Sequence, residues 1–94
     1  MTTATLRIAV VGDFNPEYHT HHAINDSLRH AAGALDLPME SKWVATACAA
    51  RDADRIFRDY NGLFIASGSP YRSMEGAFAA IQFARVHRWP LIGT

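Results

Sequence analysis

Three histidines near the start of the chain have a spacing that could serve a metal ion. His19 and His22 are three positions apart, with His21 between them. Side chains three positions apart on a helix project from the same side, so both imidazoles could reach one ion. Only Asp13 and Glu17 lie near enough in sequence to add a ligand, whereas zinc takes three or four from the protein. Solvated histidines at a helix start are therefore the favoured interpretation, and metal binding stays open.

Other short motifs resemble reactive or binding sites, but each lacks part of the required pattern. Cys48 lies between alanines, with no glycine turn before it and no histidine placed after it. A reactive thiolate needs a positive or helix N-terminal environment, so we predict a packed side chain. Ser67-Gly68-Ser69 lacks the first and last glycines of the G-x-S-x-G nucleophile turn. Gly12-Asp13-Phe14-Asn15 could cradle a phosphate at a helix start, although one glycine is a weak signal.

Length and composition limit what such motifs can belong to. The chain has 94 residues, nine Lys and Arg against nine Asp and Glu, and 49% apolar residues. These values predict one folded domain over residues 1–94 and no nucleic-acid partner, because polyanion binding needs excess positive charge. The apolar runs are too short to cross a bilayer, and the first residues lack the order of a signal peptide. A single cysteine excludes an internal disulfide, so we expect a cytoplasmic protein with no membrane partner.

Strand-like and helix-like segments alternate from end to end. Apolar or alternating runs predict strands over residues 6–11, 39–46, 63–66 and 90–93. Helices are predicted to begin between residues 15 and 20 and end before Pro38, to span 49–60, and to begin after Ser73. Asn15-Pro16-Glu17 has the residue types of a helix start. The alternation predicts right-handed crossovers and an α/β fold: a flavodoxin-like parallel sheet of about four strands in the order 2-1-3-4, with helices on both faces.

Apolar spacing assigns a buried face to each predicted helix. Ile56 and Phe57 are expected to face inward from the second helix. The stripe of the first helix consists of Ile24, Leu28, Ala31 and Leu35. The stripe of the last helix consists of Met74, Ala77, Phe78, Ile81 and either Ala84 or Arg85, and Phe83 and the other alanines widen its buried face.

The segment from residue 61 to residue 94 resembles class I glutamine amidotransferase domains, above all those related to CTP synthase. In that family a strand enters a loop of the kind P-G-G-F-G-x-R-G-x-E-G, and a helix leads to a strand that enters G-x-C-x-G. In this sequence Ser67-Gly68 occupies the position of the paired glycines, and Arg72 and Glu75-Gly76 match the family's arginine and E-G pair. The residues that depart from the family's loop are Ser67, Ser69 and Pro70. The positions that also fall in register are Ile81, Ala84-Arg85, Pro90, Gly93 and the opening residues 7–12.

The resemblance implies glutamine amide hydrolysis through a thioester-type intermediate on cysteine or selenocysteine. It implies no cofactor, and a glutamine-like small molecule as ligand. A glycine in the strand-end loop lets a backbone N–H approach the substrate carbonyl, so Gly68 is the candidate oxyanion-hole residue. The candidates for supporting the loop and the site are Ser67, Ser69, Arg72, Glu75, Gly76, Gly93 and Thr94.

The resemblance also places the family's nucleophile directly after Thr94, with its histidine and carboxylate further along. We therefore expect a truncated domain that is inactive alone, which leaves open whether the chain is an enzyme. One hypothesis for the end at Thr94 is an in-frame UGA codon for selenocysteine. The alternatives are an artificially shortened chain, a frameshifted gene or a deliberate mini-protein.

The predicted strand order leaves one helix to cover one face of four strands. The apolar face of the third and fourth strands would then be bare, which predicts a homo-oligomer that buries it, with or without exchange of the terminal strand. Two other functions stay open: a small nucleotide- or phosphate-binding module that uses Gly12 and Gly68, and a non-catalytic protein-interaction module.

Overall fold

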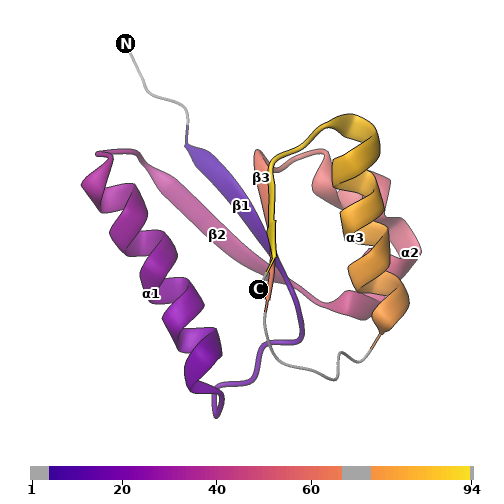
Figure 1. Ribbon diagram of the computed structural model, residues 1–94, viewed down its shortest axis with the longest axis horizontal. Helices are drawn as coiled ribbons and strands as arrows, with labels where there is room; N and C mark the ends of the chain where they lie inside the picture. Colours follow the sequence, from indigo (N-terminus) through magenta and orange to yellow (C-terminus); the bar gives the residue numbers. More distant parts are fainter. Residues whose placement is uncertain (1–4, 67–72, 94) are drawn as a thin grey trace.

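Strands and helices alternate along the chain as the sequence predicts (Figure 1). The computed structural model describes residues 5–66 and 73–93. The elements are β1 (Leu6–Val11), α1 (His19–Ala34), β2 (Met39–Val44), α2 (Thr46–Phe57), β3 (Gly62–Ile65), α3 (Met74–His87) and β4 (Leu91–Gly93). The predicted bounds of β1 agree with the observed ones. The other three strands differ from their predicted bounds by one or two residues at one or both ends.

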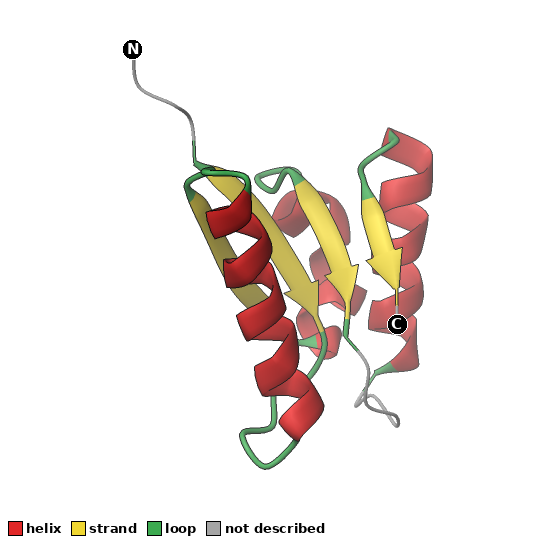
Figure 2. Ribbon diagram, turned by 60° about the vertical axis from the view of Figure 1, so that its left-hand side comes forward, coloured by secondary structure: helices red, strands yellow, loops and turns green. Residues whose placement is uncertain are grey.

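The four strands form one parallel sheet in the order β2-β1-β3-β4, which confirms the predicted order. Val11 of β1 is in register with Val44 of β2 and with Ile65 of β3, and Ile65 is in register with Gly93 of β4. All four carboxyl ends therefore meet at one edge of the sheet, as Figure 2 shows. Ligands of open parallel sheets bind at this edge.

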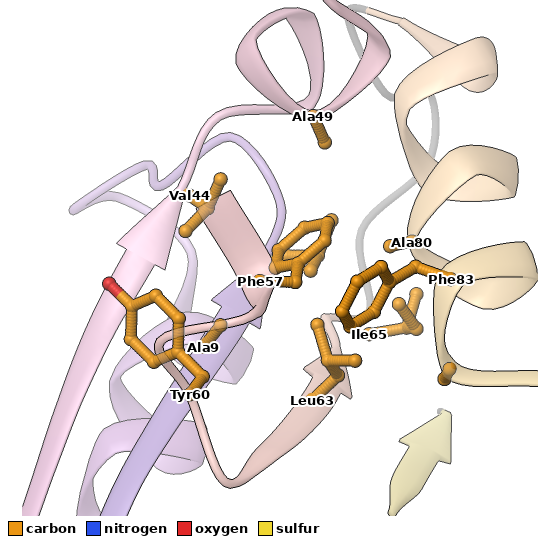
Figure 3. Packing of buried hydrophobic residues seen from close by; sticks show 11 residues of the cluster. Ala9, Val44, Ala49, Phe57, Tyr60, Leu63, Ile65, Ala80 and Phe83 are labelled. Atoms are coloured by element: carbon orange, nitrogen blue, oxygen red, sulfur yellow. The ribbon is translucent and has the colours of Figure 1, made fainter. Parts of the chain in front are cut away.

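Helices cover both faces of the sheet, with α1 on one face and α2 and α3 on the other (Figures 1 and 2). The larger core lies under α2 and α3, where the rings of Phe57 and Phe83 approach to 5.7 Å between centroids (Figure 3). The core under α1 is smaller and is built on Val10, Ile24 and Ala66. The two faces therefore contribute unequally to the buried apolar area.

Helix α1 begins at His19, within the predicted interval, but Asn15 does not cap it. The side chain of Asn15 instead accepts a hydrogen bond from the N–H of Glu17 at 2.9 Å, which closes a local turn before the helix. Tyr18 occupies the cap position without a side-chain hydrogen bond. The prediction of a cap at Asn15 is wrong because asparagine satisfies the loop backbone as readily as a helix start.

The predicted apolar stripe of α1 is buried along only half of its length. Ile24 is buried and Leu28 packs against the smaller core, whereas Ala31 is exposed and Leu35 is 68% exposed. The smaller core lies toward the carboxyl end of β1, next to the first half of the helix. The second half of α1 has too few apolar neighbours to bury the rest of the stripe.

Helix α2 begins at Thr46, three residues before the predicted start. It begins there because the Asp13 carboxylate, which follows β1, accepts a hydrogen bond from the N–H of Thr46. Phe57 is fully buried and Ile56 packs partly against the core, as predicted. The helix is kinked at Asp52, whose φ of −153° and ψ of 41° lie outside the helical range.

Helix α3 has the predicted cap and only part of the predicted buried face. The Ser73 side chain accepts a hydrogen bond from the N–H of Gly76 at 3.2 Å. The buried residues are Gly76, Ala77, Ala80, Phe83 and Ala84. Met74, Phe78 and Ile81 are 49%, 61% and 39% exposed, and Arg85 is also exposed, so the predicted stripe is wrong at these positions. The small residues allow α3 to approach α2 closely, and this turns the large side chains outward.

Exposure rises across the sheet face that carries α1. Val10, Phe64 and Ile92 lie in one row of the register on β1, β3 and β4. Val10 is fully buried, Phe64 is half-buried and Ile92 is 62% exposed. Helix α1 therefore covers β1 but leaves β4 open. In the described ranges, 5–66 and 73–93, no helix has the length and apolar character needed to cross a membrane.

Candidate functional site

Three polar residues join the ends of β1, β2 and the start of α3 at the carboxyl edge of the sheet. Asp13 follows β1, Thr46 begins α2, and Ser73 caps α3. The Asp13 carboxylate accepts the N–H of Thr46 at 3.1 Å through Oδ1, and the Thr46 hydroxyl at 2.8 Å through Oδ2. The Thr46 hydroxyl oxygen in turn accepts the N–H of Ser73 at 2.9 Å. We call these three residues the polar clamp.

The polar clamp satisfies backbone groups that would otherwise lack partners. Helix starts leave N–H groups unpaired, and a carboxylate near the N-terminus is favoured by the helix dipole. Asp13 serves α2 in this way, and Ser73 serves α3. Because Thr46 is fully buried and bonded to both neighbours, the two helix starts are held at a fixed spacing. The clamp therefore positions the edge where the strands end.

Two glycines allow the close approaches that this edge requires. A Cβ built on Gly76 would overlap the carbonyl oxygen of Thr46, so α3 can cross the start of α2 only with glycine there. A Cβ on Gly12 would lie 2.8 Å from the Cβ of Ala66 and 3.2 Å from the Trp43 ring. Close packing therefore explains why glycine is needed at both positions, independent of any ligand.

Asp13 also bears on the predicted phosphate loop at Gly12. The predicted loop, residues 12–15, leads to α1, whereas the Asp13 carboxylate within it is bonded to the start of α2. A phosphate held by this loop would meet that negative charge at short range.

The sequence-predicted site residues are only partly within the described ranges. Glu75 is exposed in the first turn of α3, where an acid is favourable for the helix. Gly93 lies at the carboxyl end of β4, in register with Ile65. Ser67, Gly68, Ser69, Arg72 and Thr94 lie outside the described residues. The oxyanion role of Gly68 therefore stays a prediction.

The histidines at the start of α1 form different local hydrogen bonds. The interpretation of solvated histidines is wrong at His21, which is buried and whose Nδ1 accepts the N–H of Asn15 at 3.0 Å. Its ring lies 4.8 Å from the Trp43 ring and 5.9 Å from the Phe14 ring, between centroids. His22 contacts the carbonyl oxygen of Pro16 at 2.7 Å through Nε2. Within the part of the chain that the structure describes, no three His, Cys, Asp or Glu residues are grouped to hold a metal ion.

Cys48 is a free, half-buried thiol that packs against the larger core. Its sulfur lies 3.9 Å from a guanidinium nitrogen of Arg51, at the solvent side of α2. It is not part of the polar clamp.

Reasoning from the sequence missed the polar clamp. Asp13 was considered only as a metal ligand or as part of a phosphate loop, and Thr46 only as the end of a strand. The signal that could have found the clamp is the position of both residues directly after neighbouring parallel strands, since such positions share one edge.

The sheet order, the two helix layers and the site at the strand ends define an α/β domain of the flavodoxin-like type. No protein-family model matches the chain. The chain is 33% identical to the CTP synthase of Campylobacter jejuni over 89 residues, which cover 94% of this chain and 16% of that protein. The CTP synthase of Thermus thermophilus is 33% identical over 90 residues, with 95% and 16% coverage.

A solved structure gives the same result for the fold. The glutaminase domain of Trypanosoma brucei CTPS, solved with bound acivicin, matches with a TM-score of 0.79 and 26% identity, over 94% of this chain and 35% of that one. The chain is therefore similar in sequence to a part of the CTP synthases, and in structure to a part of the glutaminase domain of the Trypanosoma brucei protein. It spans 16% of the length of the curated relatives that it matches.

Proposed function

We propose that the chain forms the carbonyl-binding part of a glutaminase-type site, which hydrolyses the side-chain amide of glutamine to glutamate and ammonia. The observation that carries this proposal is the register of Ile65 with Gly93. The loop that follows β3 and the corner that follows β4 leave adjacent strands at one edge. In the relatives' class of site, that pair of positions brings oxyanion donors next to a nucleophile.

The chemistry divides between groups in this chain and groups beyond residue 94. A thiolate or selenolate attacks the amide carbon, and the negative charge moves to the carbonyl oxygen. Backbone N–H groups aimed at that oxygen stabilise the charge, and we assign this role to the Gly68 loop. A histidine, oriented by a carboxylate, protonates the departing ammonia, and water then releases glutamate. The nucleophile, the histidine and the carboxylate are assigned to polypeptide other than these residues.

The polar clamp supports the assigned role of the loop. Ser73 follows the loop directly and is bonded through its N–H to Thr46. Fixing Ser73 fixes one end of the loop, and β3 fixes the other. Oxyanion donors act without reorganisation cost only when the backbone that carries them is held in place.

The test is a glutaminase assay on two proteins. One is the 94-residue chain, and the other continues it with the matching remainder of the Campylobacter jejuni CTP synthase glutaminase domain. We expect ammonia release from the extended protein and none from the 94-residue chain. A matched control replaces the cysteine of the joined segment by alanine. Ammonia release by the 94-residue chain alone, or none by an extended protein that folds, would contradict the proposal.

A nucleotide- or phosphate-binding module is the second candidate, and it is less well supported. Its predicted loop at Gly12 is followed by Asp13, whose carboxylate already serves the start of α2. Thermal melting with and without nucleotides tests it, because a ligand that binds the native state raises the melting temperature. We also propose a cytoplasmic location, which the lone thiol of Cys48 supports and fractionation of the source cells would test.

A further inference from the structure

His21, in the first turn of α1, is a polar side chain with only 2% of its surface exposed. The rings of Phe14, Tyr18 and Trp43 surround its imidazole, with centroids 5.9, 5.1 and 4.8 Å away. The Trp43 ring is held in turn, because its Nε1 donates a hydrogen bond to Oδ1 of Asn25 at 2.7 Å. The packed rings therefore hold the imidazole in one orientation.

The contact at Nδ1 defines the protonation state of this imidazole. Nδ1 accepts the backbone N–H of Asn15 at 3.0 Å. Only a ring nitrogen that carries no proton can accept a hydrogen bond, and a charged imidazole has protons on both nitrogens. The ring of His21 is therefore neutral, with its proton on Nε2. It acts as an acceptor for the backbone of the loop between β1 and α1.

Asn15 shapes this loop through three hydrogen bonds. Its side-chain oxygen accepts the N–H of Glu17 at 2.9 Å, and its carbonyl oxygen accepts the N–H of Tyr18 at 3.0 Å. Both of these bonds are local and close the turn itself. The bond from the N–H of Asn15 reaches six residues on, to His21, and so ties the turn to α1. We call this bond the loop anchor.

Asp13 of the polar clamp lies in the same loop, between two fixed points. On one side, the N–H of Gly12 is hydrogen-bonded at 3.0 Å to the last carbonyl oxygen of β2. On the other side, two residues on, Asn15 is held by the loop anchor. The carboxylate of Asp13 stays on Thr46 only while the backbone between these points keeps its path. The loop anchor therefore supports the polar clamp.

We propose that His21, as a neutral acceptor, is a positioning residue for the glutaminase-type site. It holds the loop between β1 and α1 and so keeps the polar clamp assembled. Through Ser73, the clamp fixes one end of the segment to which we assign the oxyanion donors. The part played in catalysis rests on the proposed function, whereas the support of the clamp does not. The contacts are internal to the described residues, so they do not depend on which polypeptide adjoins the sheet at β4.

Three substitutions separate the two ring nitrogens of His21 from its packing. His21→Phe keeps a ring of similar size and removes both nitrogens. His21→Asn keeps an oxygen acceptor near the position of Nδ1, and His21→Gln keeps a polar group near the position of Nε2. An anchor that acts through Nδ1 predicts rescue by His21→Asn but not by His21→Gln. The matched control is His30→Phe, which changes an exposed histidine of the same helix.

Amide hydrogen exchange, followed by NMR on the 94-residue chain, tests the anchor without catalysis. In His21→Phe, we expect the N–H groups of Asn15, Thr46 and Ser73 to exchange about tenfold faster or more, relative to the amides of β1. His21→Asn should slow this exchange again, and His30→Phe should leave it unchanged. Unchanged exchange at Thr46 and Ser73 in His21→Phe would overturn the proposal. Equal exchange in the asparagine and glutamine variants would also overturn it.

The unmodified chain offers a test that does not require a variant to fold. The ¹⁵N shifts of the His21 imidazole should show a proton on Nε2 and none on Nδ1 near neutral pH. A proton on Nδ1 would contradict the loop anchor, because both partners of the bond would then be donors.

The part played in catalysis is tested on the extended protein of the glutaminase assay. His21→Phe should lower kcat about tenfold or more with little change in KM, because displaced oxyanion donors bind the transition state less well. His21→Asn should recover part of the loss. An unchanged kcat despite faster exchange would overturn the positioning role. An extended protein that is inactive without any substitution would contradict the proposed function instead, and the exchange rates would still decide whether His21 supports the clamp.

Discussion

The carboxylate of Asp13 holds both the N–H and the hydroxyl of Thr46, at 3.1 and 2.8 Å. The two residues are 33 positions apart in sequence, yet each lies two residues after the end of a strand, at the same edge of the sheet. This pair thus links the end of β1 to the start of α2, and through Ser73 to the start of α3.

Asp13→Ala should lower the free energy of unfolding by about 1–3 kcal/mol, because it removes the acceptor of two hydrogen bonds at a helix start. Thr46→Val should cost a similar amount, since it leaves the N–H of Ser73 without its acceptor. Urea denaturation of both single variants and the double variant measures their coupling. We expect the double variant to lose less free energy of unfolding than the two single variants together. The difference should be about 0.5 kcal/mol or more.

The control for this pair is Asp26→Ala. Asp26 also forms a hydrogen-bonded ion pair, with Arg29, but both side chains are about two-thirds exposed on α1. Exposed pairs of this kind contribute about 0–1 kcal/mol. Additive effects of Asp13→Ala and Thr46→Val would contradict a shared clamp.

Gly76→Ala should destabilise the protein by about 1–3 kcal/mol or more, although alanine is normally the better helix residue. The reason is the overlap of the new Cβ with the carbonyl oxygen of Thr46. Gly33→Ala in α1 is the matched control, since nothing lies within 4 Å of its Cβ position. That variant should be stabilised by up to about 1 kcal/mol, as measured by thermal melting. The same sign for both variants would refute the close helix crossing.

Gly12→Ala should cost about 1–3 kcal/mol, because its Cβ would lie 2.8 Å from the Cβ of Ala66. Ala66→Gly removes that Cβ and should recover part of the loss when the two changes are combined. Chemical denaturation of the two single variants and the double variant tests this. No recovery in the double variant would mean that the contact with Trp43, at 3.2 Å, sets the cost.

Leu28→Ala and Leu35→Ala should have unequal effects although both positions belong to one predicted stripe. Leu28 packs against the smaller core, so its truncation should cost about 1–3 kcal/mol, whereas exposed Leu35 should cost about 0.5 kcal/mol or less. Urea midpoints measure the difference. Equal losses would show that the second half of α1 is buried in solution.

Much of the fold follows from local patterns in the sequence. The β-branched run of β1 predicted its bounds, and Ser73 was correctly identified as a helix cap. The strand order follows from the single reversal that is usual in doubly wound sheets, which does not depend on side-chain detail. These features are local or general, so one sequence suffices for them.

The errors have a common physical origin in contacts between distant segments. The spacing of Met74, Phe78 and Ile81 is that of a buried stripe, and no local pattern could show that α3 buries only the alanines and Phe83 beside them. That choice depends on the approach of α3 to α2 at Gly76. The early start of α2 likewise depends on Asp13, far away in the sequence.

The central place of β1 in the sheet has a consequence for synthesis on the ribosome. Of the four strands that the structure describes, β1 is made first, yet it pairs with β2 and β3 on its two sides. At about 5–20 residues per second, roughly 3–10 s pass between completion of β1 and completion of β3. During that interval the apolar residues 8–11 lack the strand that pairs with them on the β3 side. The nascent chain therefore presents a ready binding segment to ribosome-associated chaperones.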